Sequence, residues 1–361
     1  MNKQICALAA CVLLGAAALY AAPLLRPVGH VVYLSGDPSA VRAARPLWLG
    51  IGLGLPVQPF DFFQTGADEL IEIQTDDQIG VRAMLRIQPD SAVYLDALGD
   101  TERPSHALRL LSGAVSVRMR DADPRARLEV VTGGPEISAA GADYDVTVAL
   151  DGGVLVTVSH GTARVGDPRG RVLFADAERA VEYRPDGTFR SVAMTVGRAD
   201  RFRSVWRDQI EAEFAFDAID TYRRYADRYL DQLPRFEAAY RQVMDQRHIL
   251  DRWMENDRRG RVPRRQSEVT EAEVREVGPT LDQAYDALLP FEDNWYRLQR
   301  LAQFADAGVG PLDRAVGERL SVAEFFERLR RESRIVEEQM HTVRYATRLY
   351  RQRSAALLRT E

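Results

Sequence analysis

The sequence predicts an α+β protein with two segregated domains, an all-β sandwich followed by an all-α helical bundle of coiled-coil-like character. The composition changes near residue 200. The first 199 residues hold 20 of the 25 glycines and 42 charged side chains, whereas the last 162 hold 5 glycines and 59 charges. The spacing of apolar residues changes at the same place, from the period of strands to that of helices. We therefore expect a β domain over residues 27–197 and a helical domain over residues 198–361.

We expect residues 1–26 to be a signal peptide or an N-terminal membrane anchor. No charge occurs from Gln4 to Leu25, a run longer than a signal-peptide core and close to the roughly 20 residues that span a bilayer. We favour a retained anchor. Cleavage near Ala22 stays open, and so does lipidation of Cys11, because "LAAC" resembles a lipidation signal. In each case the chain beyond Arg26 lies outside the cytoplasm.

Short alternating runs predict the strands of the first domain. The clearest is the stretch 139–165, where Tyr144, Val146 and Val148 alternate with polar residues before a turn at Asp151-Gly152-Gly153. A glycine in such a turn supplies the positive φ that a tight hairpin needs. Similar runs bounded by Gly, Asp, Pro or Ser lie at residues 30–37, 69–75, 92–95, 108–119 and 128–134. Their spacing favours a sandwich or a barrel.

Apolar stripes predict the helices of the second domain. Residues 199–233 carry one stripe at steps of three and four, and Pro234 is expected to kink or divide that helix. One or two shorter helices should follow over residues 269–304. A final helix is expected to start with a capping box at Ser321 and Glu324. Its apolar heptad positions form a candidate helix-pairing seam of Val322, Phe326, Leu329, Val336, Met340, Val343 and Tyr350, which favours an antiparallel bundle.

Composition and motifs argue against several functions. The net charge of −5 and the single lysine, Lys3, argue against nucleic-acid binding and exclude a phosphate-loop lysine. Both cysteines lie in the first 26 residues, so the exported part has no thiol chemistry. The five histidines are far apart, and Ser159 and His160 are adjacent in a strand, so they point to opposite faces. We predict no enzyme, no metal and no cofactor.

The stretch "RRGRVPRR" at residues 258–265 is a candidate interaction loop. Its five arginines repel one another unless an acidic partner is near. An exposed loop between helices is the simpler interpretation, and contact with lipid phosphates or with an acidic protein face is the functional one. The candidate side chains are Arg258, Arg259, Arg261, Arg264 and Arg265.

The order of the β motifs resembles the FecR domain, an extracytoplasmic β module of bacterial signalling proteins. The resemblance covers about residues 28–185 and rests on five stretches in the family's order, at residues 28–43, 60–77, 85–95, 108–119 and 139–165. Two positions depart from the family: Phe60 precedes Asp61 where a glycine is usual, and Ala142 replaces a threonine. In regulators of this family, a cytoplasmic segment that binds a sigma factor precedes the membrane span. Because only Met1 to Gln4 precede the apolar run, we expect that segment to be absent.

From these observations we predict an exported, envelope-associated protein that acts as a protein-interaction or signalling module in the bacterial periplasm. It would be anchored in the inner membrane or released after cleavage. Its partner would be an envelope protein, and it could form a homo-oligomer through the C-terminal helix. Two alternatives stay open: binding of an envelope glycan or peptidoglycan, which exposed aromatic residues on one sheet face would support, and a structural role through self-association.

Overall fold

The computed structural model describes residues 27–47, 49–75, 82–96, 105–119, 127–259, 268–317 and 320–358. The N-terminal segment for which export or anchorage is predicted lies outside these ranges. Within them, no helix is both long enough and apolar enough to cross a bilayer. The strands come first and the helices follow, as predicted, and the change occurs between Ala193 and Ala199.

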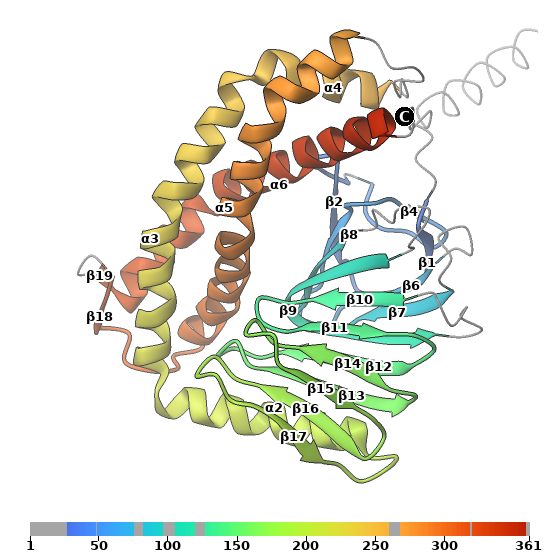
Figure 1. Ribbon diagram of the computed structural model, residues 1–361. Coiled ribbons are helices and arrows are strands. Elements are labelled where there is room, and N and C mark those ends of the chain that lie inside the picture. The colour runs from blue at the N-terminus through green and yellow to red at the C-terminus, as the bar shows by residue number, and fades with distance from the viewer. Residues whose placement is uncertain are drawn as a thin grey trace, which may run out of the picture.

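Seventeen strands of the described ranges form two layers that share one long strand, β9 (Ser105–Met119) (Figure 1). We call the layers sheet A and sheet B. Sheet A has the order β4 (Pro56–Val57), β1 (Gly29–Ser35), β6 (Leu70–Thr75), β7 (Ala83–Ile87), β9, β12 (Asp143–Val148), β13 (Val154–His160), β16 (Arg179–Tyr183) and β17 (Phe189–Ala193). Sheet B has the order β3 (Arg45–Pro46), β2 (Ser39–Arg42), β5 (Phe62–Gln64), β8 (Ala92–Asp96), β9, β10 (Arg127–Val131), β11 (Glu136–Ala139), β14 (Ala163–Gly166) and β15 (Val172–Ala175).

Strand β9 passes from sheet B to sheet A at Gly113. Residues before it pair with β8 and β10, and residues after it pair with β7 and β12. Gly113 has φ of 81°, and a Cβ at this position would lie 2.3 Å from Oγ of Ser91. Only glycine combines that backbone angle with so close a neighbour. Gly113 therefore makes the corner at which the two layers join.

The core of the β domain lies between the two sheets and follows the predicted alternation. Tyr144, Val146 and Val148 of β12 point into it, and Gly152 makes the hairpin turn with φ of 86°. The opposite faces of both sheets are also buried. Leu155 and Ala180 pack under one helix, and Phe62 and Tyr94 join the core of the helical bundle, so the second region covers both outer faces of the first.

The helical region consists of α2 (Ala199–Phe216), α3 (Ala218–Asp245), α4 (Arg247–Arg258), α5 (Glu268–Asp306) and α6 (Val322–Leu358), with a small hairpin of β18 (Ala315–Val316) and β19 (Leu320–Ser321) before α6. Figure 1 shows α2 beside β16 and β17, and the longer helices in an arch on the other side of the sheets. Helix α5 packs against both α3 and α6.

Three helix predictions need correction. The stripe over 199–233 is not one helix, because the chain turns at Asp217 between α2, which covers sheet A, and α3, which packs in the bundle. Pro234 does not end α3; its neighbours Leu233 and Phe236 are buried, and this packing outweighs the lost hydrogen bond. The stretch 269–304 belongs to a single helix of 39 residues, α5, which continues through Pro279 and Pro290.

Candidate functional site

The predicted arginine loop is only partly within the described residues. Arg258 ends α4 and Arg259 follows it, and both are exposed. Arg259 forms an ion pair with Glu255 at 2.7 Å, and Arg258 lies 3.9 Å from the same carboxylate. Arg261, Arg264 and Arg265 lie outside the described residues. A role for this loop in binding stays a prediction.

The predicted seam of α6 faces the core of the helical bundle. Six of its side chains are buried and Tyr350 is half-buried against the same core: Val322, Phe326, Leu329, Val336, Met340 and Val343. The capping box that starts the helix is confirmed, because Glu324 accepts the Ser321 N–H at 2.8 Å and donates its own N–H to the serine hydroxyl. The seam serves packing within the chain, and self-association through it stays a prediction.

The interface between sheet B and helices α5 and α6 is closed and holds paired polar groups. The Tyr94 hydroxyl lies 2.5 Å from Nδ1 of His341. The Arg344 guanidinium lies over the ring of the same tyrosine, 3.9 Å from its centroid. Arg344 also donates to Glu292 at 2.7 Å, and both side chains of this ion pair are fully buried. These contacts join the two regions of the chain without leaving an accessible polar group.

Burial determines the protonation states in this closed interface. It lowers the pKa of His341 to about 3, and the positive charge of Arg344 acts in the same direction. Burial also raises the pKa of Tyr94 well above its ordinary value, and the charge of Glu292 adds to this effect. A neutral imidazole has one ring nitrogen that accepts, so we assign Nδ1 as the acceptor of the tyrosine hydroxyl.

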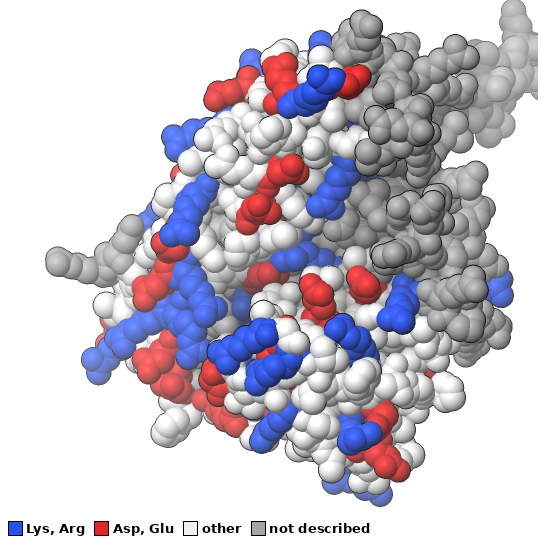
Figure 2. All heavy atoms as spheres, viewed as in Figure 1, with Lys and Arg blue, Asp and Glu red and all other residues white. Residues whose placement is uncertain are grey.

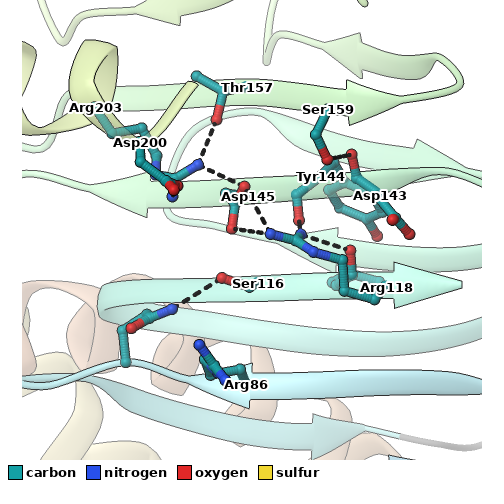
Figure 3. Close-up of polar contacts among 12 residues, drawn as sticks. Arg86, Ser116, Arg118, Asp143, Tyr144, Asp145, Thr157, Ser159, Asp200 and Arg203 are labelled. Atoms are coloured by element: carbon teal, nitrogen blue, oxygen red, sulfur yellow. Dashed lines mark hydrogen bonds and ion pairs between the residues drawn. The ribbon is translucent and has the colours of Figure 1, made fainter. Parts of the chain in front are cut away.

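The interface between sheet A and α2 is built on buried carboxylates (Figure 3). Asp145 of β12 is 3% exposed and accepts hydrogen bonds from Arg203 of α2 at 2.5 Å and from Arg118 of β9 at 3.3 Å. Arg203 also donates to Thr157 of β13 at 3.1 Å. Because Arg203 is the helix residue that reaches two strands, it fixes the distance between α2 and the sheet.

A second buried carboxylate, Glu182 of β16, holds the other side of α2. It accepts the indole N–H of Trp206 at 2.9 Å and is paired with Arg184 and Arg190, each at 2.7 Å. Burial by itself would raise the pKa of Glu182, but the hydrogen bonds from Trp206 and the two arginines outweigh it and hold the pKa below its ordinary value. The carboxylate is therefore charged at neutral pH.

Beside this network lies a cleft of about 530 Å³, within the range of small-ligand sites. Its floor is the outer face of β9 and β12. One wall is α2, with Arg203, Ser204 and Arg207, and another is α5, with Arg297 and Arg300. Apolar side chains of the floor lie next to both acidic and basic groups. The cleft therefore suits a ligand that has charged and apolar parts.

Arg297 makes no hydrogen bond and no ion pair with the described residues. The same holds for Arg207 of α2, but that side chain is exposed, whereas Arg297 is buried. Arg203 is paired with Asp145, and Arg300 is paired with Asp90 at 2.7 Å. Arg297 is only 8% exposed, and its buried Nε atom lacks a hydrogen bond. Its guanidinium carbon lies 5.1 Å from the centroid of the Tyr225 ring. The carboxylate of Asp293 on the same helix attracts this charge, but no acceptor in the described residues forms a hydrogen bond with the guanidinium, so the group can donate to an oxyanion from outside.

Sequence reasoning missed this cleft, and the other sites that it considered do not coincide with it. His160 is exposed at the end of β13 and does not line the cleft. In the ranges that the structure describes, no group of three or more His, Cys, Asp or Glu side chains could hold a metal ion. The exposed aromatic residues there are Tyr33 of β1, Phe174 of β15 and Phe216 of α2, on three separate elements. The glycan alternative therefore lacks the pattern that would favour it.

Comparison with known proteins concerns the sandwich. Residues 61–164, which run from the start of β5 into β14, match the family model described as FecR protein. They form a FecR domain. No curated protein matches the chain. The resemblance expected from the order of the β motifs is thus confirmed over this part of the chain.

Two solved structures of a proposed anti-sigma factor from Parabacteroides distasonis are also similar. They share 11% and 12% sequence identity with this chain, cover 38% and 39% of it, and have TM-scores of 0.33 and 0.34. The similar part spans 62% and 63% of those two chains, less than two thirds of each. Scores this low add nothing to the assignment, which rests on the FecR match.

The departure from the FecR pattern at Phe60 has a structural consequence. Phe60 has φ of 65°, in the left-handed region where the family's glycine would be unstrained. Its side chain is buried beside Tyr94 and Arg344 at the closed interface. The next residue, Asp61, is buried and accepts three hydrogen bonds from Arg42, the shortest at 2.6 Å. The burial of the Phe60 side chain offsets part of the cost of the strained backbone.

Proposed function

We propose that this protein is an exported, envelope-associated regulatory module that acts by binding an envelope protein, not by catalysis. The FecR domain supports a regulatory role, since this domain is known from signalling proteins. The uncharged run from Gln4 to Leu25 supports export. The site of binding in this proposal is the cleft between sheet A, α2 and α5.

The observation that carries the proposal is the buried guanidinium of Arg297 in that cleft, which makes no hydrogen bond with the described residues. A charged hydrogen bond to a carboxylate would satisfy the buried group, and the planar fork of arginine matches a carboxylate in two-point contact. The surrounding acids, such as Asp208 and Glu211, disfavour a doubly charged phosphate. We infer that the partner presents a carboxylate next to an apolar side chain.

The surface charge is consistent with a selective protein contact. Figure 2 shows basic and acidic side chains interspersed over the visible face, without a large area of one sign. The net charge of −5 gives no attraction for polyanions. Recognition would therefore depend on the local geometry of the cleft.

Photo-crosslinking in intact cells tests this proposal. A benzophenone side chain would be placed at Ser204, which is exposed and lines the cleft, or at Val205, its neighbour on α2, which is 57% exposed and does not line it. Position 204 should yield one defined envelope protein and position 205 should not. Mass spectrometry of the captured chain would also report whether the N-terminal peptide is retained. Equal adducts from both positions, or none from position 204, would remove the cleft from the proposal.

A further inference from the structure

The segment that follows β3 exposes leucine side chains to an unusual degree. We call residues 49–55 the leucine loop. Leu49 is 86% exposed and Leu53 is 72% exposed, whereas Ile51 and Leu55 of the same loop are packed against the core of the sandwich. No charged residue occurs from Pro46 to Phe60. An outward row of leucines without any charge is typical of a surface that another apolar medium covers.

Backbone hydrogen bonds fix the leucine loop to the first strand. The N–H of Val31 donates to the carbonyl of Leu55 at 3.0 Å, and the N–H of Gly54 donates to the carbonyl of Val31 at 2.8 Å. Gly50 and Gly54 have φ of 70° and 79°, which allows the chain to turn tightly directly after each exposed leucine. The exposure of Leu49 and Leu53 therefore belongs to a defined conformation.

Strand β1, to which the leucine loop is hydrogen-bonded, extends the apolar surface. Its pairing with β6 is interrupted by a bulge between Val31 and Tyr33, and Val32 and Tyr33 are 42% and 50% exposed. Other large exposed apolar residues, such as Phe174 and Ile335, lie on separate elements. Figure 1 places β1 and β4 at the edge of the β domain opposite to α3. The apolar surface is thus confined to that edge.

The position of this edge in the chain indicates what covers it. The uncharged run ends at Leu25, and β1 begins at Gly29. Four residues extend at most about 14 Å, so a membrane span formed by that run would hold β1, and the leucine loop bonded to it, close to the bilayer surface. The exposed Arg45, just before the loop, would face the anionic headgroups.

We propose that the leucine loop inserts Leu49 and Leu53 into the headgroup region of the bilayer in which the N-terminal segment is anchored. The β domain then lies next to the membrane with its β1 edge facing the bilayer. This contact rests on the export that the proposed function includes and on the membrane anchor predicted for residues 1–26. It adds a defined orientation, because one flexible tether would leave the domain free to rotate and a second contact removes that freedom.

Fluorescence in vesicles tests the contact. The full chain, with Cys6 and Cys11 changed to serine, would carry one new cysteine at Leu53 or, as a control, at Val205, labelled with an environment-sensitive dye. It would be reconstituted in vesicles of phosphatidylethanolamine and phosphatidylglycerol. The dye at residue 53 should shift to the blue and be quenched by brominated lipid. The dye at residue 205 should show neither change.

A second variant separates the loop from the anchor. A dye on a cysteine at Val32 should be blue-shifted when Leu49 and Leu53 are present. With L49D and L53D it should lose this shift, while the chain still floats with the vesicles. If the chain floats but the dye at residue 53 shows no blue shift, the bilayer contact is wrong and the N-terminal anchor is retained as an explanation. If the chain does not float, the bilayer contact and the N-terminal anchor are both wrong. A blue shift at residue 53 that appears only when another envelope protein is added would assign the loop to a protein partner and would also overturn the proposal.

Discussion

The two outer faces of the sandwich are covered by helices in different ways. On sheet B, α5 and α6 enclose Tyr94, His341, Arg344 and Glu292, and these side chains are hydrogen-bonded in pairs, Tyr94 with His341 and Arg344 with Glu292. On sheet A, α2 is held by Asp145 and leaves a cleft beside it. Arginine supplies the polar contact on both faces. The difference lies in hydrogen bonding: Arg344 is hydrogen-bonded to Glu292 and joins the two regions, whereas Arg297 in the cleft makes no hydrogen bond with the described residues and is the group that we propose binds the partner.

The largest expected effect comes from breaking the closed interface. Changing Glu292 to Gln keeps the shape of the side chain and leaves Arg344 buried without the carboxylate that pairs with it. We expect a loss of about 3 to 5 kcal/mol in the free energy of unfolding, measured by chemical denaturation. The control is Arg235→Ala, which breaks an exposed pair with Asp231 and should cost less than about 1 kcal/mol. Equal losses for the two variants would contradict the account of the closed interface.

His341 should make stability depend on pH. In the folded protein its pKa is about 3, whereas the unfolded chain takes up a proton near the ordinary value of 6.5. At pH values between these two pKa values, His341 takes up a proton when the chain unfolds. The free energy of unfolding therefore rises with pH by about 1.4 kcal/mol per pH unit between about pH 4 and about pH 6. Denaturation curves of the protein and of His341→Gln should differ by this slope. Parallel pH profiles would show that the imidazole is protonated or exposed in the folded state.

Phe60 offers a smaller test of the same interface. Both Phe60→Ala and Phe60→Gly lose the buried ring and should be less stable than the parent. Because the residue has φ of 65°, the glycine variant avoids the strain that alanine keeps. It should be more stable than the alanine variant by about 1 kcal/mol in the free energy of unfolding. The usual order, with alanine more stable, would mean that the backbone is not left-handed there.

The smallest effect on stability is expected in the cleft. Arg297→Gln removes no hydrogen bond of the described residues; it removes the contact with the Tyr225 ring and the electrostatic attraction to Asp293, which Arg109 still pairs. Its free energy of unfolding should change by about 1 kcal/mol or less in thermal or chemical denaturation. A loss as large as that for Glu292→Gln would place Arg297 among the residues that hold the fold, and would remove the contrast between the two faces.

Much of the fold could be predicted from the sequence because local patterns determine it. The alternation in β12 identified Tyr144 and Val146 as core residues, and the capping box at Ser321 identified the start of α6. The turn at Asp217 and the continuity of α3 through Pro234 were missed. Both depend on which partner each helix packs against, and the local sequence does not contain that information.

The candidate site could not be predicted for the same reason. Asp145 looks like a polar residue on an exposed strand face until α2, more than fifty residues later, covers it with Arg203. Arg297 has the same local surroundings as other arginines of the helical region. Only the packing of α5 beside the β12 to β13 turn, where Gly152 leaves room for it, separates this arginine from the paired ones.

The most direct test of the contrast between the two faces is the crosslinking yield from position 204 in the Arg297→Gln variant. A charged hydrogen bond contributes roughly 1.5 to 3 kcal/mol, which is about tenfold or more in affinity. The account predicts that the variant folds with nearly unchanged stability and that the adduct with the envelope partner falls by about tenfold. An unchanged adduct from a stable variant would show that Arg297 does not bind the partner.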